Sequence, residues 1–478
     1  MAYDGEFAKH GVLIDFAGNE LIKEMLQNCD LLEEQGGHLP PALLHIERTD
    51  WRPGQVFAID GSNRTVPITN GYPGASAGFL SVATVMIDMD KLQQESAAPT
   101  INPVTFAEVE KAYATTGVLP TSNVVRKGLP DARSSFRHQL HELLKTTKPI
   151  DGGESLLDTY QAVLALKPAS DRLSCPLMDL CPDKTHSPNL ALGVCACGKG
   201  AVYPTDQLRI HERYYDNSPN GESIGETRSL MEHLTLLNYL RYIAQKGYWN
   251  AFKDTGFILD GPLAIFGHAA WFSERVKLEL QRLNALAREH TGQDILVLGI
   301  EKSGQFFEHW LHLDEARKQS VVPRKMDFSK PDVYDEKSDW SHEELEPLER
   351  LRGRIQPGQV LLLDNAYIRR NIARGDETTI HGISTYYGRP FLYKTKSSAM
   401  IVGMIPMLSE PCEDRSNALP EQYPRLPDAL DLLDSLISMR YPNAILPLMA
   451  AHAHAAIPVQ MGDRMFEQLV REHLGSAT

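Results

Sequence analysis

Val56-Phe57-Ala58-Ile59-Asp60-Gly61-Ser62-Asn63 is the stretch around which the chain is organised. Four apolar residues lead into a carboxylate and a glycine follows, which is typical of a buried strand that ends at Asp60. Gly61 lets the backbone bend there or approach another group closely. A carboxylate at the end of a buried strand is costly unless a partner compensates for its charge, and a divalent cation is one such partner.

A second stretch, Gly256-Phe257-Ile258-Leu259-Asp260-Gly261-Pro262, repeats this pattern. A single Asp-Gly pair more often does no more than begin a turn. Two copies, each after an apolar run, favour two strands that bring Asp60 and Asp260 together around metal. The pair therefore suggests a metal-dependent nuclease, since such enzymes gather carboxylates around their cations.

The composition sets limits on this hypothesis. The chain has 478 residues, of which 42% are hydrophobic and 23% charged, as in ordinary globular proteins of about two or three domains. Its net charge of −14 argues against strong unaided binding to DNA, so metal ions and a partner protein are expected to help hold such a substrate. No apolar run is long enough to span a membrane, and the first residues are acidic rather than signal-like, so we expect a cytoplasmic protein.

The order of elements predicts an α/β fold with a mixed sheet. Apolar runs predict strands at about 55–60, 78–88, 255–260, 295–300 and 360–364 and a hairpin at 385–393, and helical periodicity predicts helices at about 105–168, 223–246, 272–289, 427–440 and 444–456. Such sheets place their ligands at strand ends, where Asp60 and Asp260 are expected.

The same pass divides the chain. Residues 1–50 are expected to form an N-terminal helical segment, residues 51–100 and 220–478 the nuclease domain, and residues 101–219 an inserted helical segment whose last part, 169–219, is rich in cysteine. The charged stretch 313–356 is expected to be a surface excursion or linker.

A third carboxylate should come from the helix that precedes Asp260, where Glu226 and Glu232 are the candidates. Six positions separate them, so they point to different sides of a helix and only one is expected to serve. Glu226 has a structural alternative as the partner of Ser223 in a capping box. Glu232 lies between apolar residues, and we prefer it, although a solvated face position is its alternative role.

Two further residues could assist. Lys302 follows the strand 295–300 and could stabilise charge on a scissile phosphate, although it could also be a plain surface lysine. His452 lies in an apolar, small-residue stretch that should form a helix packed on the core. It could bind metal or move protons, while a lone histidine on such a helix is more often a satisfied core residue.

The cysteines form a separate signal. Four of them are close in the sequence and suit a structural, tetrahedral Zn²⁺ site: Cys175, Cys181, Cys195 and Cys197. Their spacings are looser than paired Cys-x-x-Cys motifs, and His186 could replace one thiolate. Cys29 and Cys412 stand alone and are expected to be buried thiols.

Taken in order, these pieces resemble the NurA nucleases. The resemblance covers about 55–90 and 223–460 and rests on the Ile-Asp-Gly-Ser strand, the helix with a central glutamate, the Leu-Asp-Gly strand, the strand that ends near Lys302, and the late Tyr-Pro…Ala-His segment. It implies an RNase H-like core, Mn²⁺-dependent DNA cleavage in end resection, and a dimer docked on a hexameric HerA-type ATPase. It also implies catalytic roles for Asp60, Glu232, Asp260 and His452, with Lys302 nearby, and a link to anti-phage defence. The cysteine-rich insertion and the acidic excursion depart from the compact archaeal pattern.

Three functions remain open at this point. The first is a Mn²⁺- or Mg²⁺-dependent deoxyribonuclease that works with a ring ATPase, since the chain itself has no Gly-x-x-x-x-Gly-Lys-Ser/Thr loop. The second is a non-catalytic, nuclease-like adaptor or cap of such a motor. The third is an RNA-directed nuclease on the same core.

Overall fold

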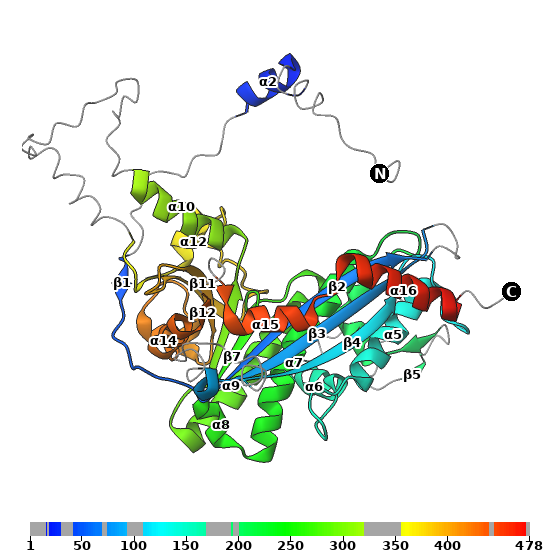
Figure 1. Ribbon diagram of the computed structural model, residues 1–478, viewed down its shortest axis with the longest axis horizontal. Helices are drawn as coiled ribbons and strands as arrows, with labels where there is room; N and C mark the ends of the chain where they lie inside the picture. Colours follow the sequence, from blue (N-terminus) through cyan, green and yellow to red (C-terminus); the bar gives the residue numbers. More distant parts are fainter. Residues whose placement is uncertain are drawn as a thin grey trace, which may run out of the picture. The chain divides into compact units, whose positions relative to one another are not determined.

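A mixed sheet lies at the centre of the computed structural model, which describes residues 16, 19–29, 42–68, 74–92, 109–168, 193–194, 200–319, 355–438 and 444–474. Among these residues nine strands pair in the order β1-β9-β10-β11-β8-β7-β2-β3-β4 (Figure 1). Their bounds are β1 Leu44–His45, β2 Gln55–Pro67, β3 Ser76–Asp88, β4 Glu110–Pro120, β7 Thr255–Asp260, β8 Leu296–Glu301, β9 Gln359–Leu362, β10 Gly388–Lys394 and β11 Met400–Pro406. β2, β7 and β8 run parallel to one another and the other pairs are antiparallel. The α/β fold with a mixed sheet is therefore confirmed.

Helices and short pairs complete the architecture. The α-helices are α2 Glu20–Gln27, α5 Ala132–Thr146, α6 Leu156–Leu164, α7 Gly221–Lys246, α8 Trp249–Asp254, α9 Phe272–Thr291, α10 Gln305–Gln319, α12 Asn365–Asn371, α13 Glu410–Glu413, α14 Leu426–Leu436, α15 Leu446–Ala455 and α16 Val459–Leu474. The 3₁₀ turns are η2 Pro204–Leu208, η3 Ile210–Arg213, η4 Gly267–Trp271 and η5 Pro420–Gln422, and the short strand pairs are β5 Gly193–Val194 with β6 Ala201–Val202 and β12 Ile437–Ser438 with β13 Ala444–Ile445.

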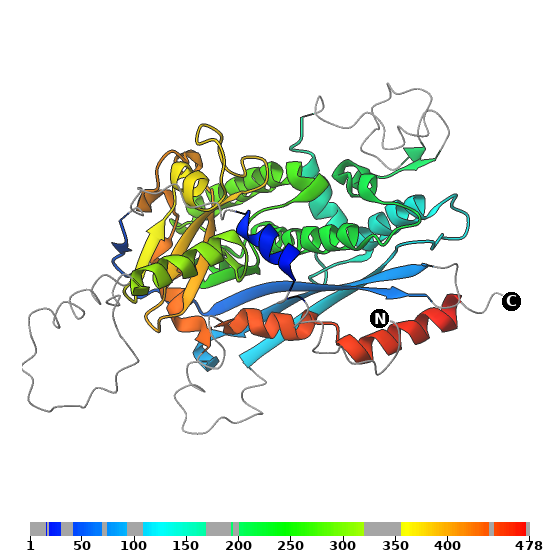
Figure 2. The same cartoon turned by 90° about the horizontal axis from the view of Figure 1, so that it is seen from above.

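Alternation along β2 divides the core into two layers. Phe57 and Ile59 pack with residues of α5, α6, α7 and α9 on one face, whereas Val56 and Ala58 pack with residues of α14 and α15 on the other. Figure 2 shows α7 and α9 on one side of the strands and α15 and α16 on the opposite side. Since side chains alternate along a strand, Asp60 points to the face covered by α15.

The observed elements depart from expectation in several places. β2 does not end at Asp60 but continues to Pro67, paired throughout with β3. The residues 110–120, expected to be helical, form the edge strand β4, and α5 and α6 follow as helices. The expected hairpin is also wrong, since 388–390 begin the continuous strand β10, whose partners are β9 and β11. α16 follows α15 as an additional helix.

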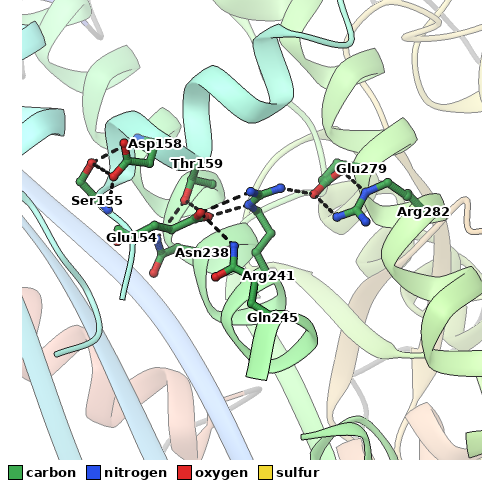
Figure 3. Close-up of polar contacts among 9 residues, drawn as sticks. All are labelled: Glu154, Ser155, Asp158, Thr159, Asn238, Arg241, Gln245, Glu279 and Arg282. Carbon is green, nitrogen blue, oxygen red and sulfur yellow. Dashed lines mark hydrogen bonds and ion pairs between the residues drawn. The ribbon is translucent and has the colours of Figure 1, made fainter. Parts of the chain in front are cut away.

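Polar residues join α6, α7 and α9 in a network drawn in Figure 3. Arg241 on α7 donates Nε to Glu154 Oε1 and Nη1 to Glu279 Oε1, both at 2.6 Å. Arg282 donates to both oxygens of Glu279 at 2.8 Å. Burial raises the pKa of Glu279, but these hydrogen bonds outweigh it and hold that pKa below the ordinary value. The negative charges of Glu154 and Glu279 are thus each balanced by arginine.

The chain separates into Met1–Pro40 and Pro41–Thr478 by its contacts, and the expected boundaries at 100 and 220 remain predictions. In the first unit α2 begins after Asn19, whose side chain accepts a hydrogen bond from Leu21 N. Cys412 is buried as expected, but Cys29 is exposed. Cys175, Cys181, Cys195, Cys197 and His186 lie outside the described residues, as does most of 313–356. Within the described part of the chain, the helices are too short or too polar to cross a bilayer.

Candidate active site

The parallel strands β2, β7 and β8 bring three of the expected site residues to one region of the sheet. Ile59 on β2 is in register with Leu259 on β7, so Asp60 and Asp260 are the next residues along each strand. β7 ends at Asp260, while β2 continues with β3 as its partner, so Asp60 lies where β2 loses its β7 neighbour. Lys302 directly follows the end of β8. The strand termination expected at Asp60 is therefore found at Asp260.

Asp60 is 4% exposed and contacts the helix that covers its face. Its Oδ1 accepts a hydrogen bond from Gly61 N at 2.7 Å, and its Oδ2 lies 2.8 Å from Nδ1 of His452. His452 belongs to α15, which Leu448 and Ala451 anchor in the core. Its own side chain is 63% exposed, so His452 is not the satisfied core histidine that an apolar helix suggested.

Asp260 pairs with Lys302, whose Nζ lies 2.8 Å from Oδ2. Burial raises the pKa of Asp260, Lys302 opposes this effect, and the negative charge of Asp60 adds to it. The charge of Asp60 thus lies close enough to act on Asp260. The Lys302 side chain is partly exposed, but its ion pair with Asp260 distinguishes it from a plain surface lysine.

Glu232 reaches the same region from the other face of the sheet. It lies in the middle of α7, is 3% exposed, and sits directly over Gly61, where a Cβ atom would come within 2.4 Å of its Oε1. Burial raises the pKa of Glu232 to about 8; Arg228 opposes this shift, whereas the charges of Asp60 and Asp260 increase it. Gly61 is therefore needed for close approach, and Glu232 belongs electrostatically to the aspartate pair.

Glu226 has a different role from Glu232. Its Oε1 accepts a hydrogen bond from Ala269 N at 2.9 Å, which fixes the loop after β7. It is not a capping-box residue, because α7 begins after Asn220 and Ser223 lies inside the helix. Of the two candidates left open by the sequence, Glu232 is the one beside the aspartates.

Arg228 was missed from the sequence. One turn before Glu232, it donates Nη1 to Glu232 Oε1 and, at 3.2 Å, to the carbonyl oxygen of Gly61. The i, i+4 spacing of Arg228 and Glu232 on a helix was the available signal. Its approach to Gly61 depends on the sheet, which helical spacing does not reveal.

The donor set was tested against the expected metal. Across the ranges that the structure describes, no three or more His, Cys, Asp or Glu side chains converge in a metal-binding arrangement. Instead, Asp60 faces His452, Asp260 faces Lys302 and Glu232 faces Arg228. The oxygen-rich chemistry nevertheless fits Mg²⁺ or Mn²⁺, which prefer carboxylates. Burial raises the pKa values of Glu232 and Asp260 by more than Arg228 and Lys302 offset.

Glu301, the residue before Lys302, points away from the aspartates. It ends β8 opposite Val402, and its Oε2 is buried without a hydrogen-bond partner. Burial raises its pKa to about 7. Since Glu301 and Lys302 are consecutive residues at a strand end, their side chains leave on different sides, and only Lys302 contacts Asp260.

Comparison with solved structures returned NurA nucleases. The NurA nuclease from Sulfolobus solfataricus is 10% identical, with 91% of this chain and 87% of that chain covered and a TM-score of 0.32. A second NurA structure is 11% identical, with 97% and 95% covered and a TM-score of 0.26. A NurA structure with manganese is 12% identical, with 97% and 96% covered and a TM-score of 0.19. No family model and no curated protein matches this chain. The site assignment therefore rests on the geometry of this chain.

Proposed function

We propose that this chain is a metal-dependent nuclease that hydrolyses phosphodiester bonds in DNA. The observation that carries the proposal is the meeting of Asp60, Asp260 and Glu232 from two strands and a helix, with charges that oppose one another. Arg228 and Lys302 pair with Glu232 and Asp260 but do not offset the effect of burial on their pKa values, unlike the arginines that pair with Glu154 and Glu279. Residues that tolerate such crowding are candidates for function.

Asp60 and Asp260 would hold the cation, with Glu232 as the third carboxylate. One or two Mn²⁺ or Mg²⁺ ions in such a site supply an activated water and neutralise charge on the phosphate. The side chains that now face the carboxylates, Lys302 and Arg228, carry the positive charge that a phosphate group would meet. Arg228 and Lys302 are both partly exposed, so each can reach a bound backbone.

His452 is suited to moving a proton. Its Nδ1 faces the Asp60 carboxylate, which favours the tautomer with the proton on Nδ1 and leaves Nε2 as an acceptor. The exposed ring can then take a proton from a water molecule or return one to the leaving oxygen. The hydrogen bond to Asp60 orients the ring.

The family resemblance extends the proposal to partners and cofactors. A HerA-type hexameric ATPase would supply the ATP-driven motion, and a homodimer would present two active sites to the DNA, in end processing or anti-phage defence. The RNase H-like core, the cytoplasmic location and a structural Zn²⁺ at the four clustered cysteines belong to the same proposal. The net charge of −14 supports the need for a DNA-holding partner.

The test is cleavage of end-labelled linear DNA by the purified chain, with and without a HerA-type ATPase, in Mn²⁺, Mg²⁺ or EDTA. We expect cleavage in Mn²⁺ or Mg²⁺, none in EDTA, and none by Asp60→Ala protein that retains its fold. An RNA strand of the same sequence serves as the alternative substrate. Cleavage by Asp60→Ala at the wild-type rate would exclude this active centre. No cleavage under any of these conditions would exclude the nuclease and leave the adaptor role.

A further inference from the structure

Arg228 contacts two parts of the proposed active site. It lies one turn before Glu232 on α7, so the two side chains share one face of the helix. Its Nη1 donates to Glu232 Oε1 and, at 3.2 Å, to the carbonyl oxygen of Gly61. Gly61 directly follows Asp60 on β2, and the charge of Asp60 acts on Glu232. One guanidinium group therefore pairs with the carboxylate that we assign to the cation.

The close packing at Gly61 makes this ion pair an obstacle to a cation. A Cβ atom on Gly61 would lie 2.4 Å from Glu232 Oε1 and 3.0 Å from Arg228 Cγ, so neither side chain has free space on that side. A divalent cation bound by Glu232 would meet the positive charge of the guanidinium on the same carboxylate. Like charges at such short distances repel strongly where little water screens them. The cation and Arg228 therefore compete for Glu232.

Arg228 is held less firmly than Arg241, another arginine of α7. The Arg241 side chain is 14% exposed and is held by two carboxylates, those of Glu154 and Glu279. The Arg228 side chain is 28% exposed, and in the described part of the chain it forms its ion pair with Glu232 alone. An anion that arrives from solvent can therefore reach Arg228, whereas the Glu232 side chain is only 4% exposed.

The proposed substrate supplies such an anion. Each phosphodiester group of DNA carries a negative charge, and guanidinium groups bind phosphate through two parallel hydrogen bonds. If Asp60, Asp260 and Glu232 share the cation, the phosphate that it binds must lie beside Glu232, which Arg228 already contacts. That phosphate would give Arg228 a new partner as its contact with Glu232 is lost.

We propose that Arg228 couples DNA binding to cation binding, an inference that rests on the nuclease function proposed above. Without DNA, the guanidinium pairs with Glu232. A DNA phosphate draws the guanidinium away and leaves the carboxylate to the cation. Such coupling is reciprocal, so the cation must favour DNA binding by the same factor as DNA favours cation binding. The centre then holds its cation tightly only when a strand is in place.

The first experiment is a double-mutant cycle on DNA binding in EDTA, where no cation takes part. Fluorescence anisotropy at low ionic strength measures how tightly labelled linear DNA binds to the wild-type chain, Arg228→Met, Glu232→Gln and the double variant. Arg370→Met is the control, because Arg370 also pairs with a glutamate, Glu377, and its side chain is 31% exposed. Circular dichroism checks the fold of each variant.

We expect Arg228→Met to weaken DNA binding by about tenfold or more, because a charge-assisted contact with phosphate is lost. Glu232→Gln should tighten binding by about tenfold, because Arg228 no longer has to leave a carboxylate. In the double variant this gain should vanish, so that it binds DNA as Arg228→Met does. The double variant has the net charge of the wild type, so net charge alone predicts wild-type binding for it. Arg370→Met should bind as wild type.

Arg228→Met leaves a buried carboxylate unpaired and is the variant most prone to unfold. If it unfolds, the other two variants still decide the question. The coupling predicts that Glu232→Gln binds DNA more tightly than the wild type and that the double variant binds it more weakly. Any other order of these two affinities overturns the coupling.

The second experiment measures Mn²⁺ binding without DNA, from the electron paramagnetic resonance signal of the free ion. Binding that Asp60→Asn abolishes is assigned to this centre. Arg228→Met should bind Mn²⁺ about tenfold more tightly than the wild type, since the guanidinium no longer competes for Glu232. Arg370→Met should bind Mn²⁺ as the wild type does.

The outcomes separate the two proposals. If Glu232→Gln tightens DNA binding equally with and without Arg228, or if Arg228→Met leaves the Mn²⁺ affinity unchanged, the coupling is overturned, and cleavage of DNA in Mn²⁺ leaves the nuclease standing. A non-additive cycle in a chain that cuts DNA in no metal supports the exchange of Arg228 between Glu232 and DNA and overturns the nuclease. Absence of measurable DNA binding by the wild-type chain overturns the coupling.

Discussion

Two acidic clusters share α7, and they treat buried carboxylates in opposite ways. In the network of Glu154, Arg241, Glu279 and Arg282, hydrogen bonds from arginine outweigh burial and lower the pKa values of Glu154 and Glu279 (Figure 3). In the cluster around Asp60, burial prevails and the pKa of Glu232 rises to about 8. In the first cluster arginine outweighs burial, whereas in the second burial outweighs Arg228 and Lys302. This difference is what distinguishes a structural ion network from a candidate cation site.

The largest expected effect is on catalysis. Asp60→Asn keeps a hydrogen-bonding side chain next to Gly61 and His452 but removes one charge, so the fold should remain intact. We expect DNA cleavage in Mn²⁺ to fall by about 10³-fold or more, as for residues that act as a catalytic unit. Single-turnover cleavage measures the rate, and circular dichroism checks the fold. A variant that is folded and cleaves within tenfold of wild type would contradict the prediction.

Removing the arginine of the complete cluster should reduce stability instead. Arg241→Met leaves Glu154 and Glu279 without their shared cation, which should cost about 3–5 kcal/mol in free energy of unfolding. Arg282→Met is the control, because that side chain is 50% exposed and should cost no more than about 1 kcal/mol. Urea unfolding measures both variants. Equal losses for the two would show that Arg241 has no special role.

A methyl group at Gly61 tests the close approach of Glu232. In Gly61→Ala the new Cβ would lie 2.4 Å from Glu232 Oε1, so this carboxylate must move away from the aspartates. We expect cleavage to fall by roughly 10²-fold, since catalysis is sensitive to misplacement of about 1 Å. The control is Gly225→Ala on α7, the helix that carries Glu232. Its Cβ would meet no atom within 4 Å, and stability should rise by about 0.5–1 kcal/mol. Wild-type activity in Gly61→Ala would place Glu232 outside the site.

The smallest expected effect is that of a Glu→Gln substitution on the free energy of unfolding, and it has opposite signs in the two clusters. The pKa of Glu232 is raised from 4.5 to about 8, so the folded state keeps a proton that the unfolded chain releases, and stability falls as the pH rises through this window. Glu232→Gln should therefore raise the free energy of unfolding more at about pH 8 than at about pH 5. The pKa of Glu279 is lowered, so its charge stabilises the fold at neutral pH and Glu279→Gln should be destabilising. Urea unfolding of both variants without divalent cations, at both pH values, measures the change in stability. If both variants were stabilised, or both destabilised, the proposed contrast between the clusters would be contradicted.

The sequence revealed the parts of the site that depend on local pattern. Apolar runs that end in Asp-Gly predicted the neighbouring strands of Asp60 and Asp260, and helical spacing predicted α7 with Glu232. The edge strand β4 was missed because its residues are mostly exposed, so they lack the alternation that marks a half-buried strand. The continuation of β2 was missed because β3 alone satisfies residues 61–67, which carry few apolar side chains.

Contacts between segments that are distant in the sequence could not be predicted from local sequence patterns. Arg228 contacts the site only because the sheet brings Gly61 under α7. The exposure of His452 depends on how α15 lies across β2. Glu226 and Glu232 were left open by spacing, and their burial and partners distinguish them. Pairings of this kind depend on tertiary packing, which neither propensity nor periodicity encodes.

Anomalous diffraction from crystals soaked in Mn²⁺ tests the contrast between the clusters most directly. We expect a manganese peak between the carboxylates of Asp60 and Asp260, with Glu232 nearby, and none at Glu154 or Glu279. No peak at Asp60 and Asp260 in saturating Mn²⁺, or an equal peak at Glu154 and Glu279, would contradict the proposed active site.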